Sequence, residues 1–168
     1  MAPKRSKVRA PARPCQPLVT TLQRGYLADF VGGFGPGKRE SRPRADGFVK
    51  PVGIVKLGST IVVADARQRA VFRVELVSGR AVMRLQLAGN IDRPDSLCAF
   101  DLDSVLVTTY DEQAKRGTLR RLPLDGRVIT IASGAWEPRG IATDGERAFV
   151  AMRRGGQVMT FLVEPSEV

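Results

Sequence analysis

Three groups of basic residues recur at regular intervals and could bind anionic partners. The groups are Arg67 with Arg69, Lys115 with Arg116, and Arg153 with Arg154. Arginine presents a forked set of N–H donors that matches carboxylate and phosphate oxygens, and lysine adds a mobile positive charge. If the three groups hold equivalent places in a repeat, they form a basic rim on one face of the protein. Such a rim could contact acidic side chains or the phosphates of RNA.

Two aromatic residues are expected in loops of the same face. Tyr110 and Trp136 could stack on nucleic-acid bases or anchor a protein partner, since aromatic and arginine side chains dominate binding energy at interfaces. Phe48 and Trp136 also suit a packing role, because they stand just before prolines where core residues are expected. The candidate binding residues are Arg67, Arg69, Tyr110, Lys115, Arg116, Trp136, Arg153 and Arg154.

Catalytic and metal-binding patterns are absent from the sequence. The chain has no histidine, so it lacks Ser-His-Asp and Cys-His arrangements and the commonest general base and zinc ligand. Asp101 and Asp103 could bind a hard cation, but their spacing suits turn residues equally. The glycine-rich stretch 32–40 lacks the Ser or Thr and the helix of a phosphate-binding loop, which favours a surface loop. We expect no enzyme activity, no metal and no cofactor.

A repeat along the chain predicts the elements that position these residues. The segments KPVGIV (50–55), RPDSLC (93–98) and EPRGIA (137–142) resemble one another, and their prolines are 43 and 44 residues apart. This period is that of a four-stranded propeller blade. The chain therefore holds three repeating units.

Short β-branched stretches with polar and apolar residues in alternation follow each proline. The expected strands are 60–65, 70–76 and 80–87, then 104–110, 117–124 and 127–132, then 140–143, 147–152 and 156–163. Asp125-Gly126 is a strong hairpin turn signal, and no stretch has helical periodicity. The connections are too short for crossover helices, which predicts an all-β fold. An isolated stretch, PLVTTLQ at 17–23, matches the fourth strand of a unit.

Four sequence patterns in the chain resemble those of a known protein family. They are VTTL (19–22), YLADFVGGFGPG (26–37), FVKPVGI (48–54) and VVADARQRAVF (62–72). Together they resemble NHL-repeat β-propellers over residues 18–163. The second unit departs from the family pattern at Asp95-Ser96 and at Thr109, and the third departs at Met152. The resemblance implies a propeller whose rings usually have six blades, and some family members bind single-stranded RNA on this face.

The predicted architecture is half of a six-bladed ring. Residues 1–16 are expected to form a basic, Pro-rich disordered arm, and residues 17–165 the propeller. Within the propeller, 17–47 form the leading strand and the Gly-rich loop. Blades 1 to 3 are 48–90, 91–134 and 135–165. The third unit lacks a fourth strand, which 17–23 would supply in cis or in trans. A homodimer would then complete the ring and remove open sheet edges. The alternative is a truncated relative that folds as an arc or is covered by another protein.

The charge distribution bears on partners and location. The formal net charge is +10, and residues 1–46 hold 10 basic and 3 acidic residues. Such an arm suits an acidic partner or simply solubilises the chain. No apolar run is long enough for a secretory signal or a membrane span, and two cysteines do not make a disulfide framework. We expect an intracellular protein. The basic, acid-free residues 1–28 suit organellar targeting, and Lys4 to Lys7 suit a nuclear import signal.

The predicted function is protein binding by a rigid scaffold that presents the basic rim. RNA or polyanion binding by the same rim and the N-terminal arm is the alternative. Affinity for RNA should fall steeply with salt, because each phosphate contact releases condensed counterions. A protein contact with a hydrophobic anchor should depend on salt much less.

Overall fold

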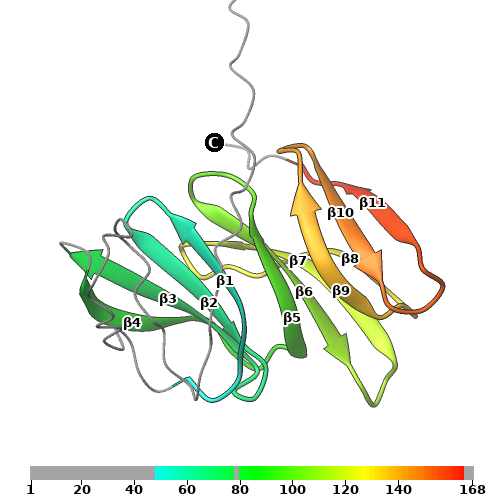
Figure 1. Ribbon diagram of the computed structural model, residues 1–168, viewed down its shortest axis with the longest axis horizontal. Helices are drawn as coiled ribbons and strands as arrows, with labels where there is room; N and C mark the ends of the chain where they lie inside the picture. The colour runs from blue at the N-terminus through cyan, green and yellow to red at the C-terminus, as the bar shows by residue number, and fades with distance from the viewer. Residues whose placement is uncertain (1–47, 78–79, 165–168) are drawn as a thin grey trace, which may run out of the picture.

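The computed structural model describes residues 48–77 and 80–164 (Figure 1). These residues form eleven strands in three antiparallel sheets and contain no helix, which confirms the all-β prediction. No helix able to cross a membrane occurs in this part of the chain. The predicted arm, the strand at 17–23 and the Gly-rich loop lie outside the described residues.

Each sheet is built from strands that are consecutive in the chain. The first sheet has the order β1 (Pro51–Leu57), β2 (Thr60–Asp65), β3 (Ala70–Val77) and β4 (Arg80–Ala88). The second has the order β5 (Arg93–Ala99), β6 (Ser104–Asp111), β7 (Arg116–Pro123) and β8 (Ile129–Gly134). The third has β9 (Pro138–Thr143), β10 (Arg147–Met152) and β11 (Val158–Leu162), with β10 in the middle. Because every pairing joins neighbours in sequence, hairpin turns make all the connections within a sheet.

The repeated prolines occupy the same register position in the three sheets. Pro51 lies opposite Asp65, and Pro94 lies opposite Thr109. In the third sheet Pro138 lies opposite Met152. A register shift follows the proline in each pair of strands. Proline is tolerated here because it stands at or beside the strand start, where a missing N–H costs little.

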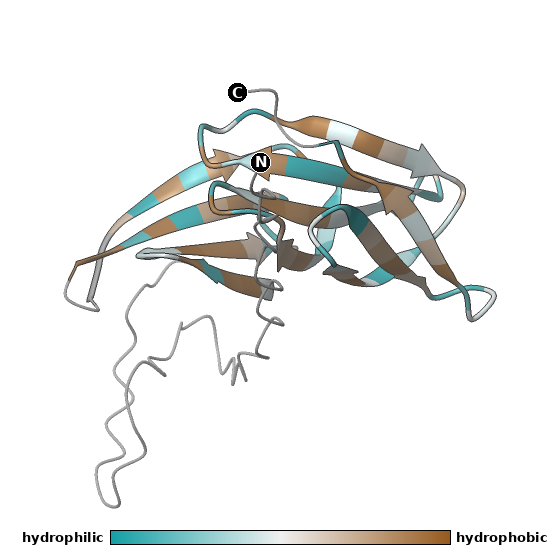
Figure 2. Cartoon of the chain, turned by 90° about the horizontal axis from the view of Figure 1, so that it is seen from above, coloured by the Kyte–Doolittle hydropathy of each residue, from teal (hydrophilic) through white to brown (hydrophobic). Residues whose placement is uncertain are grey.

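The three sheets stack in chain order, with the first at the left of Figure 1 and the third at the right. Alternate residues of a strand face opposite sides of its sheet. In β2 and β6 apolar residues stand on both sides, so each of these strands packs against a hydrophobic cluster on either face of its sheet. Val62 and Val71 of the first sheet pack with Val105 and Leu122 of the second. A second cluster joins the second and third sheets, and it contains Leu106, Leu119, Ala148 and Val150. Figure 2 shows hydrophobic residues running along the strands of the stacked sheets.

One buried arginine ties the second sheet to the segment after β11. The Nε of Arg121 donates to Oγ of Ser104 at 3.0 Å, and its NH1 donates to the carbonyl of Glu164 at 2.8 Å. Its NH2 pairs with Oδ2 of Asp101 at 2.5 Å, and its guanidinium lies 4.7 Å from the centre of the Phe100 ring. Every arm of this guanidinium therefore has a partner, as a buried charge requires.

Candidate functional site

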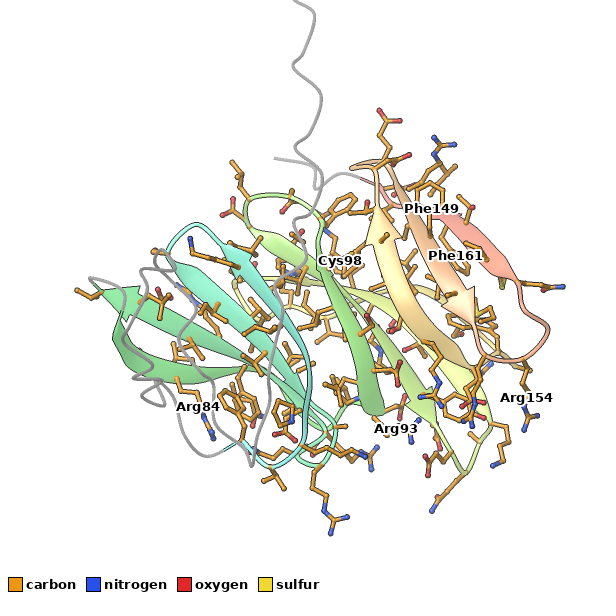
Figure 3. The ribbon with its side chains drawn as sticks, viewed as in Figure 1. Arg84, Arg93, Cys98, Phe149, Arg154 and Phe161 are labelled. Atoms are coloured by element: carbon orange, nitrogen blue, oxygen red, sulfur yellow. The ribbon has the colours of Figure 1, made fainter. Side chains whose placement is uncertain are left out.

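All three predicted basic groups lie at one end of the sheets, which we call the charged end. It consists of the β2–β3, β6–β7 and β10–β11 turns together with the starts of β1, β5 and β9. Figure 3 shows Arg93 and Arg154 at this end, along the lower side of the view. Antiparallel pairing places these turns beside the strand starts, because β2, β6 and β10 end next to the starts of β1, β5 and β9.

A buried carboxylate organises the first turn of the charged end. Oδ2 of Asp65 accepts from the backbone N–H of Val49 at 2.6 Å and of Lys50 at 3.0 Å. Its Oδ1 accepts from the backbone N–H of Arg67 and of Gln68, both at 2.9 Å. Burial alone would raise the pKa of Asp65, but hydrogen bonds from Gln68, Val49 and Lys50 outweigh it and hold the pKa below its ordinary value. Asp65 therefore fixes both the turn and the entry into β1.

The second sheet repeats this turn two residues further along its strand. Oδ1 of Asp111 accepts from the two backbone N–H groups that lie two and three residues later. Arg69 and Lys115 close the two turns with φ angles of 51° and 53°, and Gly156 holds the same left-handed place with φ of 59°. Thr109 occupies the register position of Asp65, yet β6 continues past it and Asp111 makes the turn. The β6–β7 hairpin is therefore two residues longer than the β2–β3 hairpin and keeps the same kind of turn.

A second buried carboxylate gathers three arginines. Oε1 of Glu137 accepts from NH2 of Arg139 and from NH1 of Arg153, each at 2.8 Å. The Nε of Arg154 lies 3.9 Å from Oε2 of the same carboxylate. The other arm of Arg139 donates to Oδ1 of Asp95 at 2.9 Å. The hydrogen bond from Arg153 is the main cause that lowers the pKa of Glu137, whereas burial raises the pKa of Asp95.

Carboxylates also pair with other basic residues of this end. Asp92 lies 3.6 Å from NH2 of Arg69 and 3.2 Å from NH2 of Arg120, so it joins the first two sheets. Arg93 pairs with Glu112. The predicted rim is therefore a mixed surface in which many arginines have acidic partners.

Four basic residues of the charged end are exposed and form no ion pair within the described part of the chain. They are Lys50, Arg67, Lys115 and Arg116. Together with the exposed side chains of Arg153 and Arg154, they carry much of its accessible positive charge.

Of the two aromatic candidates, Trp136 lies in a loop as expected and is partly buried, whereas Tyr110 is a buried strand residue and not an exposed loop residue. Tyr110 is a strand residue of β6 with 7% of its surface exposed, and the guanidinium of Arg93 lies 5.9 Å from its ring centre. Trp136 follows β8, but its ring packs beside Phe161 at 5.8 Å between centres. A Cβ on Gly117 would come within 2.6 Å of the Trp136 ring. The Tyr110 ring is therefore buried near Arg93, whereas the Trp136 ring is partly buried and packs with the third sheet.

Sequence reasoning missed the acidic members of the charged end. It considered only basic residues in the turns, whereas Asp92, Asp95 and Glu137 stand beside the repeated prolines. The signal was present in the segments Arg93-Pro94-Asp95 and Glu137-Pro138-Arg139, where charges of both signs flank the proline. Within the described residues no group of three acidic or sulfur-bearing side chains could hold a metal ion.

Comparison with known proteins supports the fold. No protein-family model and no curated protein matches the chain. A solved structure of a luciferin-regenerating enzyme is similar, with 10% sequence identity and a TM-score of 0.53. The similarity covers 66% of this chain and 40% of that enzyme, so the chain spans less than half of its length. At this identity the likeness shows an arrangement of antiparallel sheets and nothing of the chemistry.

This comparison corrects the prediction that the chain is not an enzyme. A protein with the same arrangement of sheets is named as an enzyme, so the prediction is wrong in inferring inactivity from fold and composition. The physical reason is that a fold positions side chains without determining what they do. The lack of histidine excludes histidine-dependent mechanisms and leaves those that use carboxylates or arginine.

Proposed function

We propose that the chain is a protein-interaction module whose charged end binds an acidic protein partner. The observation that carries the proposal is the exposed positive charge of Arg67, Lys115 and Arg116 on turns whose backbone N–H groups bind a carboxylate, the buried Asp65 in one turn and the more exposed Asp111 in the other. Rigid, pre-ordered donors lose little entropy on binding, which favours a specific contact. RNA binding by the same end is the alternative, and the burial of Tyr110 takes away one of the two aromatic rings on which bases could stack.

We further propose that the fold is an NHL-type propeller with three blades per chain, half of a six-bladed ring. In this proposal residues 17–23 of a second copy pair with β11 as the fourth strand of its sheet. The support is that the first two sheets have four strands and the third has three among the described residues. Val158 and Leu162 of β11 are 65% and 78% exposed. Pairing would cover these side chains and the open edge, which otherwise invites aggregation.

Light scattering on a size-exclusion column tests the proposed assembly. The full chain is expected to have twice the mass of 18.3 kDa. Deletion of residues 1–16 should preserve the dimer, whereas deletion of residues 1–23 should abolish it. A monomeric full chain, or a dimer that survives the longer deletion, would show that strand exchange is wrong.

Salt dependence separates the two candidate partners. A single-stranded RNA should lose affinity with salt at a log–log slope of about 0.7 for each phosphate contact. An acidic protein partner, isolated by cross-linking to the charged end, should depend on salt less steeply when apolar contacts contribute. The double substitution R67A/R116A should weaken binding of the true partner. The control R127A/R147A removes the same number of charges at the opposite end of the sheets. An equal loss of affinity in the two double variants would refute a role for the charged end.

A further inference from the structure

We propose that Arg139, Arg153 and Arg154 form a binding site for one carboxylate of an acidic peptide, an inference that rests on the proposed function and names the chemistry of its partner. Glu137 builds the site. Its buried carboxylate is only 8% exposed, while the side chains of Arg153 and Arg154 are 61% and 81% exposed. One buried anion therefore holds guanidinium groups that project into solvent.

The geometry brings two guanidinium groups together. NH2 of Arg139 and NH1 of Arg153 each lie 2.8 Å from the same oxygen, Oε1 of Glu137, so they can be no further apart than twice that distance. The backbone N–H of Arg153 also donates to the carbonyl of Glu137 at 2.8 Å, which fixes the start of the turn. Such pre-ordered N–H groups suit bidentate binding of a planar carboxylate.

The charges of the site match a single carboxylate. Three guanidinium groups face two carboxylates, those of Asp95 and Glu137, which leaves an excess of one positive charge. A carboxylate carries one negative charge and neutralises this excess, whereas a phosphomonoester carries about 1.5 to 2 at neutral pH. The exposure of Arg153 and Arg154 places the site on a surface, which suits a side chain of a peptide.

A neighbouring turn extends the site. A Cβ on Gly117 would come within 2.3 Å of the Trp136 carbonyl oxygen and 2.8 Å of Pro138, so the start of β7 lies against the segment that contains Glu137. Lys115 and Arg116 directly precede this glycine and are exposed. A partner segment with a second acidic residue would place it against these two cations.

Trp136 provides the test, because it is the single tryptophan of the chain and immediately precedes Glu137. Titration of the full chain with a glutamate-rich peptide is expected to change its fluorescence. R153A and R154A should each weaken binding about threefold to tenfold, since loss of one exposed charge-assisted contact has that order of effect. R153K keeps the charge and loses the fork, and it should also weaken binding. R127A/R147A, at the opposite end, should leave affinity unchanged.

The remaining outcomes distinguish the site from the wider proposal. If the peptide binds the wild-type chain and all arginine variants equally well, the proposed three-arginine site is wrong. The proposal of an acidic partner that binds another part of the charged end is then retained. If the wild-type chain binds no glutamate-rich peptide, both proposals fail. Tighter binding of a matched phosphoserine peptide or of an RNA oligonucleotide would overturn the carboxylate assignment. Circular dichroism of each variant checks that these exposed substitutions leave the fold intact.

Discussion

Replacing Asp65 by asparagine is expected to destabilise the first sheet because the buried carboxylate organises its entry and its turn. Asparagine keeps one acceptor oxygen and puts an NH₂ group in place of the other. With Oδ2 replaced, the bonds from the Val49 backbone at 2.6 Å and from the Gln68 side chain at 3.2 Å are lost. The backbone N–H of Lys50 loses its contact with Oδ2 at 3.0 Å but keeps its bond to Oδ1 at 3.1 Å. The remaining bonds lose their charge assistance. At about 1.5 kcal/mol for each charge-assisted bond, the substitution should cost about 3 kcal/mol of unfolding free energy.

Urea unfolding followed by circular dichroism measures this loss. The midpoint should fall at unchanged slope, since the surface exposed on unfolding stays the same. D111N is the matched control, because Asp111 makes the same turn in a more exposed place, and its effect should be much smaller. A loss of less than about 1 kcal/mol for D65N, the low end for a buried hydrogen bond, would refute the reasoning.

The same experiment has an expected pH dependence. The folded state lowers the pKa of Asp65 from its ordinary value of 3.8, so the ionised carboxylate stabilises the fold. This contribution is complete above pH 3.8 and is lost as the pH falls through the lower pKa of the folded state. The difference in stability between wild type and D65N should therefore be constant near neutral pH and shrink below pH 3.8. A difference that grows in acid would contradict the lowered pKa.

Further substitutions test the packing between the sheets. R121M should cost about 2 to 4 kcal/mol of unfolding free energy in urea titrations, because it removes the hydrogen bonds from the buried guanidinium to Ser104, to Asp101 and to the carbonyl of Glu164; a loss below about 1 kcal/mol would contradict this role. G117A should cost about 1 to 3 kcal/mol, since the added Cβ would clash with Trp136. G140A is its control, because a Cβ there meets its nearest neighbour at 3.8 Å and should be tolerated. Equal midpoints for G117A and G140A would show that the third sheet adjusts freely.

Much of the strand pattern was predictable because it depends on local periodicity. The strands expected at 60–65 and 147–152 coincide with β2 and β10, and the others shift by a few residues at their ends. Alternating side chains and turn residues act within a few positions of each other, so the sequence carries them directly. The prolines that revealed the repeat lie at equivalent register positions near the starts of β1, β5 and β9.

The burial of candidate site residues was not predictable in the same way. Tyr110 ends the strand predicted over 104–110 and was expected to be accessible there, but its side chain is buried. Alternation along a strand does not show which of its faces a neighbouring element covers, so this burial depends on the tertiary structure.

The sequence by itself determined the all-β class, the succession of hairpins and the turns that carry basic residues, because these follow from short-range alternation and turn chemistry. Only the tertiary structure decided which charges meet. The guanidinium of Arg139 reaches the carboxylate of Asp95 across 44 positions, and that of Arg121 reaches the backbone carbonyl of Glu164 across 43. Such pairs form because stacking brings neighbouring sheets into contact, and the strength of an ion pair depends on that distance and burial. The charged end is thus a product of sheet packing acting on residues that the repeat had already placed.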